Sequence, residues 1–81
     1  MIVNIDPTNG QVVKFFRSMR AVDPKLTSPE YATYVVTAAI EAGIITGGTV
    51  EDVDGMRTGN VITLAAKVNH AIAECLKPDP N

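Results

Sequence analysis

The sequence predicts a small all-α bundle of three main helices plus one short helix. Apolar residues recur at helical spacing in residues 9–22, 28–42 and 58–76, which predicts the three main helices. Helix-capping and helix-breaking residues bound these segments and mark a short helix beginning at Thr49. Residues 1–6 are compatible with a short extended segment ahead of the bundle.

The first helix follows a predicted turn at residues 6–10. Thr8 or Asn9 is a suitable N-cap, and the helix is expected to run to Val22, where an Asp-Pro pair follows. A β-hairpin across the same turn is the rival interpretation. Residues 11–16 do not alternate apolar and polar side chains as a half-buried strand does, so the helix is favoured.

The second helix has the clearest beginning in the chain. Ser28 is expected to cap it, with Pro29 at the first helical position and Glu30 near the positive helix end. It is expected to run to Ala42 and to stop at Gly43. Its apolar residues are Tyr31, Tyr34, Val35, Ala38, Ile40 and Ala42. Because they lie almost all round the helix, we expect it to be central and most buried.

Residues 44–48 are expected to form a flexible connector with two apolar anchors. The short helix then begins at Thr49, which stands in capping-box spacing with Asp52, and ends at Gly55.

The last helix is expected to begin at Thr58 or Asn60 and to run to about Leu76. Its expected apolar stripe is Val61, Leu64, Ala65, Val68, Ile72, Cys75 and Leu76. Two prolines follow and prevent continuation. We therefore expect one helical domain at residues 1–77 and a loose C-terminal tail at 78–81.

Composition narrows the class of protein. The chain has 81 residues, 46% of them hydrophobic and 20% charged, which is typical of one folded domain. Its one cysteine cannot form an internal disulfide, and no secretory signal or membrane-spanning stretch is evident. We therefore expect a cytoplasmic protein with no membrane contact.

No residue pattern predicts catalysis, a metal or a cofactor. His70 is the only histidine, and its spacing from Cys75 places the two on different faces of a helix. Aligning Gly55 with the glycine of a calcium loop puts Val50 and Val61 at positions that need oxygen ligands. The Gly-Gly-Thr sequence before the short helix lacks the remaining residues of a phosphate-binding loop. We expect a non-enzymatic protein.

Two sets of residues on the first helix are candidates for binding. The first is an apolar stripe of Val12, Phe15, Phe16 and Met19. Such a wide stripe is hard to bury fully in a small bundle, so either all of it is core or part of it meets a partner protein.

Lys14, Arg17 and Arg20 recur every three residues, as a phosphate-binding row would. The chain has a net charge of −2 and no tryptophan, so nucleic-acid binding is the alternative and protein binding is preferred.

Part of the second half resembles a known family. Residues 49–56 read Thr-Val-Glu-Asp-Val-Asp-Gly-Met, and residues 60–68 contain Leu-Ala-Ala-Lys-Val. Over about residues 40–76 this pattern resembles bacteriophage tail assembly chaperones, although Asn60 stands where such proteins often have Asp. The resemblance implies a cytoplasmic homo-oligomer, located in the host when phage-encoded. It also implies binding to an apolar helical tape-measure protein and recruitment of tail-tube subunits.

Overall fold

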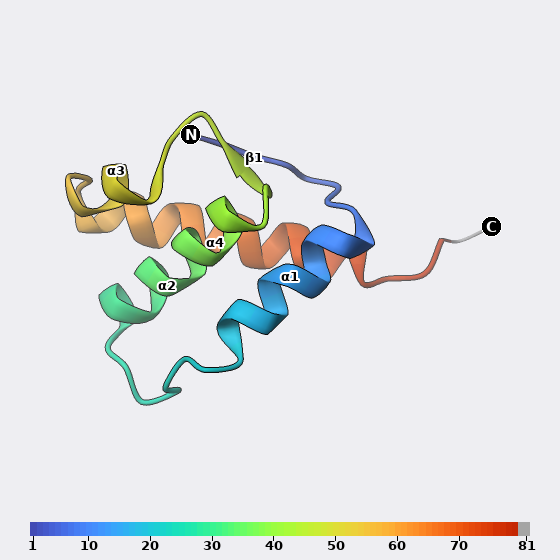
Figure 1. Ribbon diagram of the computed structural model, residues 1–81, viewed down its shortest axis with the longest axis horizontal. Helices are drawn as coiled ribbons and strands as arrows, with labels where there is room; N and C mark the ends of the chain where they lie inside the picture. Colours follow the sequence, from blue (N-terminus) through green and yellow to red (C-terminus); the bar gives the residue numbers. More distant parts are fainter. Residues whose placement is uncertain (80–81) are drawn as a thin grey trace.

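The computed structural model describes residues 1–79, which form four helices and two very short strands (Figure 1). In chain order these elements are β1 (Ile2–Val3), α1 (Asn9–Met19), α2 (Ser28–Glu41), β2 (Ile45–Thr46), α3 (Val50–Asp54) and α4 (Thr58–Cys75). Three of the helices are longer than two turns, and α3 is short. The expected all-α bundle is therefore confirmed, with a small sheet added to it.

α2 is the central helix, as predicted. It packs mainly along α4, and it also contacts α1, α3 and β2. Its buried residues are Ala32, Val35, Val36, Ala38 and Ala39. Tyr31 and Tyr34, which we expected to be buried, are exposed. Small alanines rather than tyrosines therefore occupy the packed face of α2.

α1 begins at a reciprocal capping box. The Gln11 backbone N–H donates to the Thr8 hydroxyl at 3.2 Å, and the Thr8 backbone N–H donates to the Gln11 side-chain oxygen at 2.9 Å. The other end of α1 differs from the prediction, because the helix ends at Met19 rather than Val22. The Val22 N–H donates to the Met19 carbonyl at 3.1 Å, so a tight turn replaces the last expected helical turn.

The cap of α2 lies one residue earlier than predicted. Thr27, not Ser28, is the N-cap, and its hydroxyl accepts from the Glu30 N–H at 3.4 Å. Pro29 therefore lies at the second helical position, where its missing N–H costs nothing. At the other end Gly43 has a φ of 81°, the left-handed conformation expected of a residue that follows a helix.

β1 and β2 form a two-stranded antiparallel sheet in which Ile2 lies opposite Thr46 and Val3 opposite Ile45. The extended segment predicted at the N-terminus is thus present as a strand. The flexible connector predicted at residues 44–48 is wrong in one respect, because Ile45–Thr46 is strand. Its two apolar anchors, Ile44 and Ile45, are among the most buried side chains of the protein.

α3 and α4 follow the predicted boundaries closely. The Thr49 N–H donates to the Asp52 carboxylate at 2.8 Å, which caps α3, and Gly55 ends it. α4 begins at Thr58 and ends at Cys75. Leu76 was expected in the buried stripe but is exposed, because it follows the last turn of α4 beyond the buried residues. Of the predicted tail, residues 80–81 lie outside the described part of the chain.

Candidate functional site

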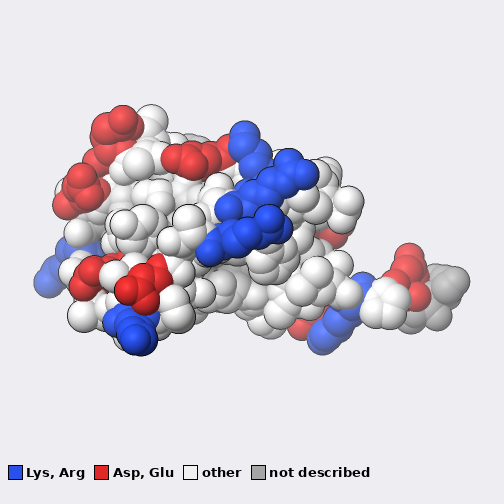
Figure 2. Space-filling view, turned by 60° about the horizontal axis from the view of Figure 1, so that its bottom comes forward, with Lys and Arg blue, Asp and Glu red and all other residues white. Residues whose placement is uncertain are grey.

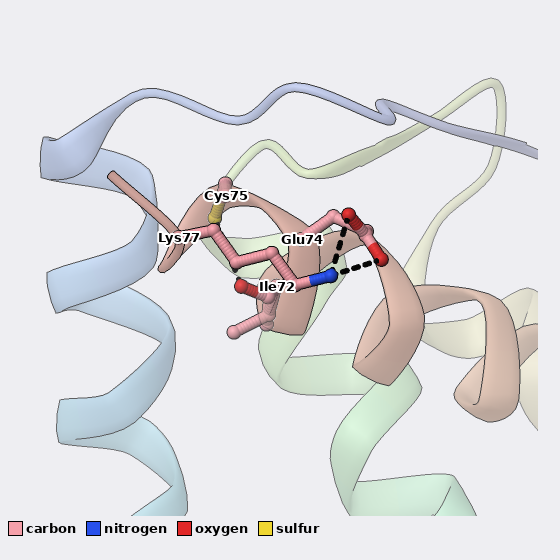
Figure 3. Close-up of polar contacts among 4 residues, drawn as sticks. All are labelled: Ile72, Glu74, Cys75 and Lys77. Atoms are coloured by element: carbon pink, nitrogen blue, oxygen red, sulfur yellow. Dashed lines mark hydrogen bonds and ion pairs between the residues drawn. The ribbon is translucent and has the colours of Figure 1, made fainter. Parts of the chain in front are cut away.

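His70 and Cys75 lie in different surroundings on α4. His70 is exposed on α4. Cys75 is half-buried, and its thiol donates to the Ile72 carbonyl at 3.2 Å in the last turn of the same helix (Figure 3). Within residues 1–79 no three His, Cys, Asp or Glu side chains gather closely enough to hold a metal ion. The two residues form no nucleophile–base pair.

The Gly47-Gly48 pair has a packing role that the sequence did not reveal. A Cβ atom added at Gly48 would lie 2.7 Å from two atoms of the Met1 side chain. Gly47 has a φ of 83°, which a residue with a side chain rarely adopts. The pair therefore makes the turn after β2 and leaves room for the N-terminal residue.

The four apolar residues singled out on α1 do not share one surface. Val12 and Phe15 belong to the core, and Phe15 is only 3% exposed. Met19 is half-buried against that core, whereas Phe16 is 45% exposed. The two phenylalanine rings meet edge to face, with centroids 5.7 Å apart. Of the candidate protein-binding residues, Val12 and Phe15 are thus not accessible to a partner in this fold, and Phe16 is.

The three basic residues predicted as a phosphate-binding row on α1 are exposed to solvent. Lys14, Arg17 and Arg20 are all exposed, and α1 itself contains no acidic residue. Among residues 1–79 the ion pair present is Lys77–Glu74, so none of these three cations is paired within the described chain. Figure 2 shows basic side chains side by side near the middle of one face, with acidic side chains on both sides of them.

A hollow in the surface lies between residues 1–5 and α4. This N-terminal groove has a volume of about 890 Å³. Its lining residues are Met1, Ile2, Val3, Ile5, Thr63, Leu64, Ala66, Lys67, His70, Ala71 and Glu74. A second hollow of about 460 Å³ adjoins it, because Met1, Thr63, Leu64 and Lys67 line both.

Small side chains on α4 and large apolar ones opposite them shape the N-terminal groove. Thr63, Ala66 and Ala71 of α4 line the groove, and their small side chains leave space along the helix. On the opposite wall Ile2 is 70% exposed and Ile5 is 82% exposed. Two isoleucines this open beside a hollow form a surface suited to an apolar partner.

Charged groups lie along the same groove. Lys67, His70 and Glu74 are exposed and project from successive turns of α4. The Lys77 ammonium contacts both Glu74 carboxylate oxygens, at 3.1 and 3.3 Å (Figure 3). A ligand would therefore meet an apolar floor with a mixed polar border.

The sequence interpretation missed this groove. It assigned the apolar residues of α4 to the core and considered residues 1–6 only as an extended segment. The available signal was the excess of apolar residues in a segment too short to form a core strand, notably Ile2 and Ile5. The alanines of α4 carried no signal, because alanine is common on both faces of a helix.

No helix within residues 1–79 has the length and apolar character needed to cross a membrane. Comparison of the chain with protein-family models, with curated proteins and with solved structures finds no match.

Proposed function

We propose that this protein is a non-enzymatic protein-binding module whose N-terminal groove holds an apolar helical segment of a partner protein. The observation that carries the proposal is the pair of exposed isoleucines, Ile2 and Ile5, facing small side chains of α4 across a hollow of about 890 Å³. An amphipathic helix docks into such grooves through residues spaced i, i+3, i+4 and i+7.

The length of the groove suits a helix. Together the two adjoining hollows follow α4 from Asn60 to Glu74. At 1.5 Å per residue this distance is roughly 21 Å, or about four helical turns. A partner helix of that length presents two or three apolar anchors on one face, and Lys67, His70 and Glu74 meet its polar flanks.

The resemblance to bacteriophage tail assembly chaperones supports the same class of function. It rests on residues 49–56 and 60–68, of which the second segment lies on α4 beside the groove. On this proposal the partner is the apolar helical tape-measure protein or a tail-tube protein. The chain keeps its partner's apolar helices soluble before assembly, in the cytoplasm and as a homo-oligomer.

Binding of a synthetic helical peptide tests the proposal. The probe is an amphipathic peptide of about 20 residues with leucines at i, i+3, i+4 and i+7 and neutral polar residues elsewhere. We expect the protein to bind it, and Ile5→Ser or Ala66→Arg to weaken binding at least about tenfold. Fluorescence anisotropy measures the affinity, and circular dichroism confirms folding.

The control is Leu76→Ser, which removes an exposed aliphatic side chain outside the groove. It should leave the affinity unchanged. Equal affinity of the Ile5→Ser, Ala66→Arg and unmodified proteins, or no binding by any of them, would contradict the proposal.

Nucleic-acid binding is the second candidate function. The observation favouring it is the row of three exposed cations without internal partners, Lys14, Arg17 and Arg20. Three phosphate contacts give a weak interaction whose logarithmic salt slope is about −2 to −3. A mobility-shift titration at low salt, repeated with all three cations replaced by alanine, checks this function.

A further inference from the structure

We infer that the outward surface of α1 is a second docking site, for a helical protein segment that carries carboxylates beside apolar side chains. This α1 outer face consists of Val13, Lys14, Phe16, Arg17 and Arg20, all of them exposed. It is separate from the N-terminal groove, none of whose lining residues belongs to α1. The inference shares its exposed cations with the nucleic-acid alternative, but it uses no residue of the groove.

Cationic and apolar side chains alternate around this face. Successive residues of a helix are about 100° apart, so the five residues follow one another over roughly 160° of its circumference. Their order is Phe16, Arg20, Val13, Arg17 and Lys14. Each exposed apolar side chain thus has an arginine beside it, and a partner that buries Phe16 or Val13 must also meet a cation.

The charges of the α1 outer face are not explained by the fold alone. Arg17 and Arg20 lie at the negative C-terminal end of α1, which stabilises cations. Lys14 lies in the middle of the helix, where the helix dipole gives no such stabilisation. Lys14 and Arg17 are also one turn apart, so their like charges repel each other. A surface that keeps three such cations unpaired is electrostatically suited to an anionic partner.

The overall charge of the molecule favours a protein over nucleic acid. Of the two apolar residues of the face, Phe16 offers a ring on which a base stacks, whereas Val13 offers none. The molecule as a whole has a net charge of −2, and its exposed acidic groups oppose a polyanion that extends beyond α1 (Figure 2). A short protein segment contacts the α1 outer face alone and avoids this repulsion.

The densest acidic segment of a second copy does not provide the matching surface. The densest acidic segment of the described chain is α3 with Glu51, Asp52 and Asp54. This helix has five residues, and Asp52 already accepts from the Thr49 N–H. Its apolar Val53 is buried. The partner we infer is another protein, in which glutamates or aspartates flank an apolar stripe. Arg17 and Arg20 bind these carboxylates through their guanidinium groups.

Three synthetic peptides test the inference. All share one apolar stripe of leucine and phenylalanine, and the flanking positions carry glutamate, glutamine or lysine. We expect the glutamate peptide to bind at least about tenfold more tightly than the glutamine peptide. The lysine peptide should bind most weakly. Equal affinity for the three peptides overturns the inference.

Charge reversal on the protein gives the sharper readout. The Arg17→Glu/Arg20→Glu variant should lose affinity for the glutamate peptide and gain affinity for the lysine peptide. Phe16→Ser should weaken the binding of both the glutamate and the glutamine peptide. The control is Arg57→Glu, an exposed cation outside α1. If Arg57→Glu loses as much affinity for the glutamate peptide as Arg17→Glu/Arg20→Glu does, the inference is overturned, because the loss then reflects the net charge of the protein.

Two further measurements test the other possible occupants of the α1 outer face, which are nucleic acid and a second copy of the chain. Single-stranded DNA that binds the unmodified protein more tightly than the glutamate peptide overturns the inference in favour of nucleic acid. A dimer in light scattering that Arg17→Glu/Arg20→Glu dissociates overturns it in favour of a second copy. All three peptides are measured on the Ala66→Arg protein, in which the N-terminal groove is blocked, so that failure here is distinguishable from failure of the groove proposal.

Discussion

At the scale of single residues, Phe15 and Phe16 show how the fold divides an apolar pair. The two are adjacent on α1, so their side chains point about 100° apart. One is 3% exposed within the core, and the other is 45% exposed beside Arg17 and Arg20. From the sequence both interpretations of the stripe were open, because helical spacing does not say how much of a wide stripe its neighbours cover.

Replacing each phenylalanine tests this division. Phe15→Ala should lower the free energy of unfolding by about 3–5 kcal/mol, because it removes a buried ring and leaves a cavity. Phe16→Ala should lower it by less than about 1 kcal/mol. Urea denaturation followed by circular dichroism measures both.

A domain of this length has a total stability of roughly 4–12 kcal/mol, so Phe15→Ala brings the protein close to unfolding. Phe15→Leu provides a milder second variant, with an expected loss of about 1–2 kcal/mol. Comparable losses at positions 15 and 16 would show that the burial assigned to α1 is wrong.

At the scale of elements, capping and breaking residues located most helix boundaries, with errors at the cap of α2 and at the end of α1. Thr49 was identified as a cap from its spacing to Asp52, and Thr8 was one of two candidate caps with Asn9. Both threonines take part in hydrogen bonds at helix N-termini. The end of α1 was misplaced, since Val22 continues the apolar pattern although the backbone has already turned at Arg20. The spacing of apolar residues alone does not indicate that turn.

The capping box of α1 makes a testable contribution to stability. Thr8→Ala removes the hydroxyl that accepts from the Gln11 N–H and should cost about 1 kcal/mol. The control is Thr63→Ala on α4, whose hydroxyl donates to the Gly59 carbonyl within the same helix. Because alanine favours the helix interior, this control should be neutral or slightly stabilising. Thermal unfolding compares the two variants, and equal destabilisation would argue against the cap.

At the scale of the whole molecule, the bundle was predictable and its candidate sites were only partly so. Buried positions such as Val35, Val68 and Ile72 follow from helical spacing within single elements. The N-terminal groove depends on how residues 1–5 lie across α4, a contact between the two ends of the chain. No local pattern encodes such a contact, so Ile2 and Ile5 became candidates only once the fold was known.

The most direct test of the central claim is a nuclear magnetic resonance titration of the isotope-labelled protein with the neutral leucine peptide. Binding in the N-terminal groove predicts shifted signals for Ile2, Ile5, Ala66 and His70, whereas Val13 stays unchanged. Shifts confined to α1, or no shifts at saturating peptide, would contradict the claim that the groove between the N-terminal segment and α4 is the binding site.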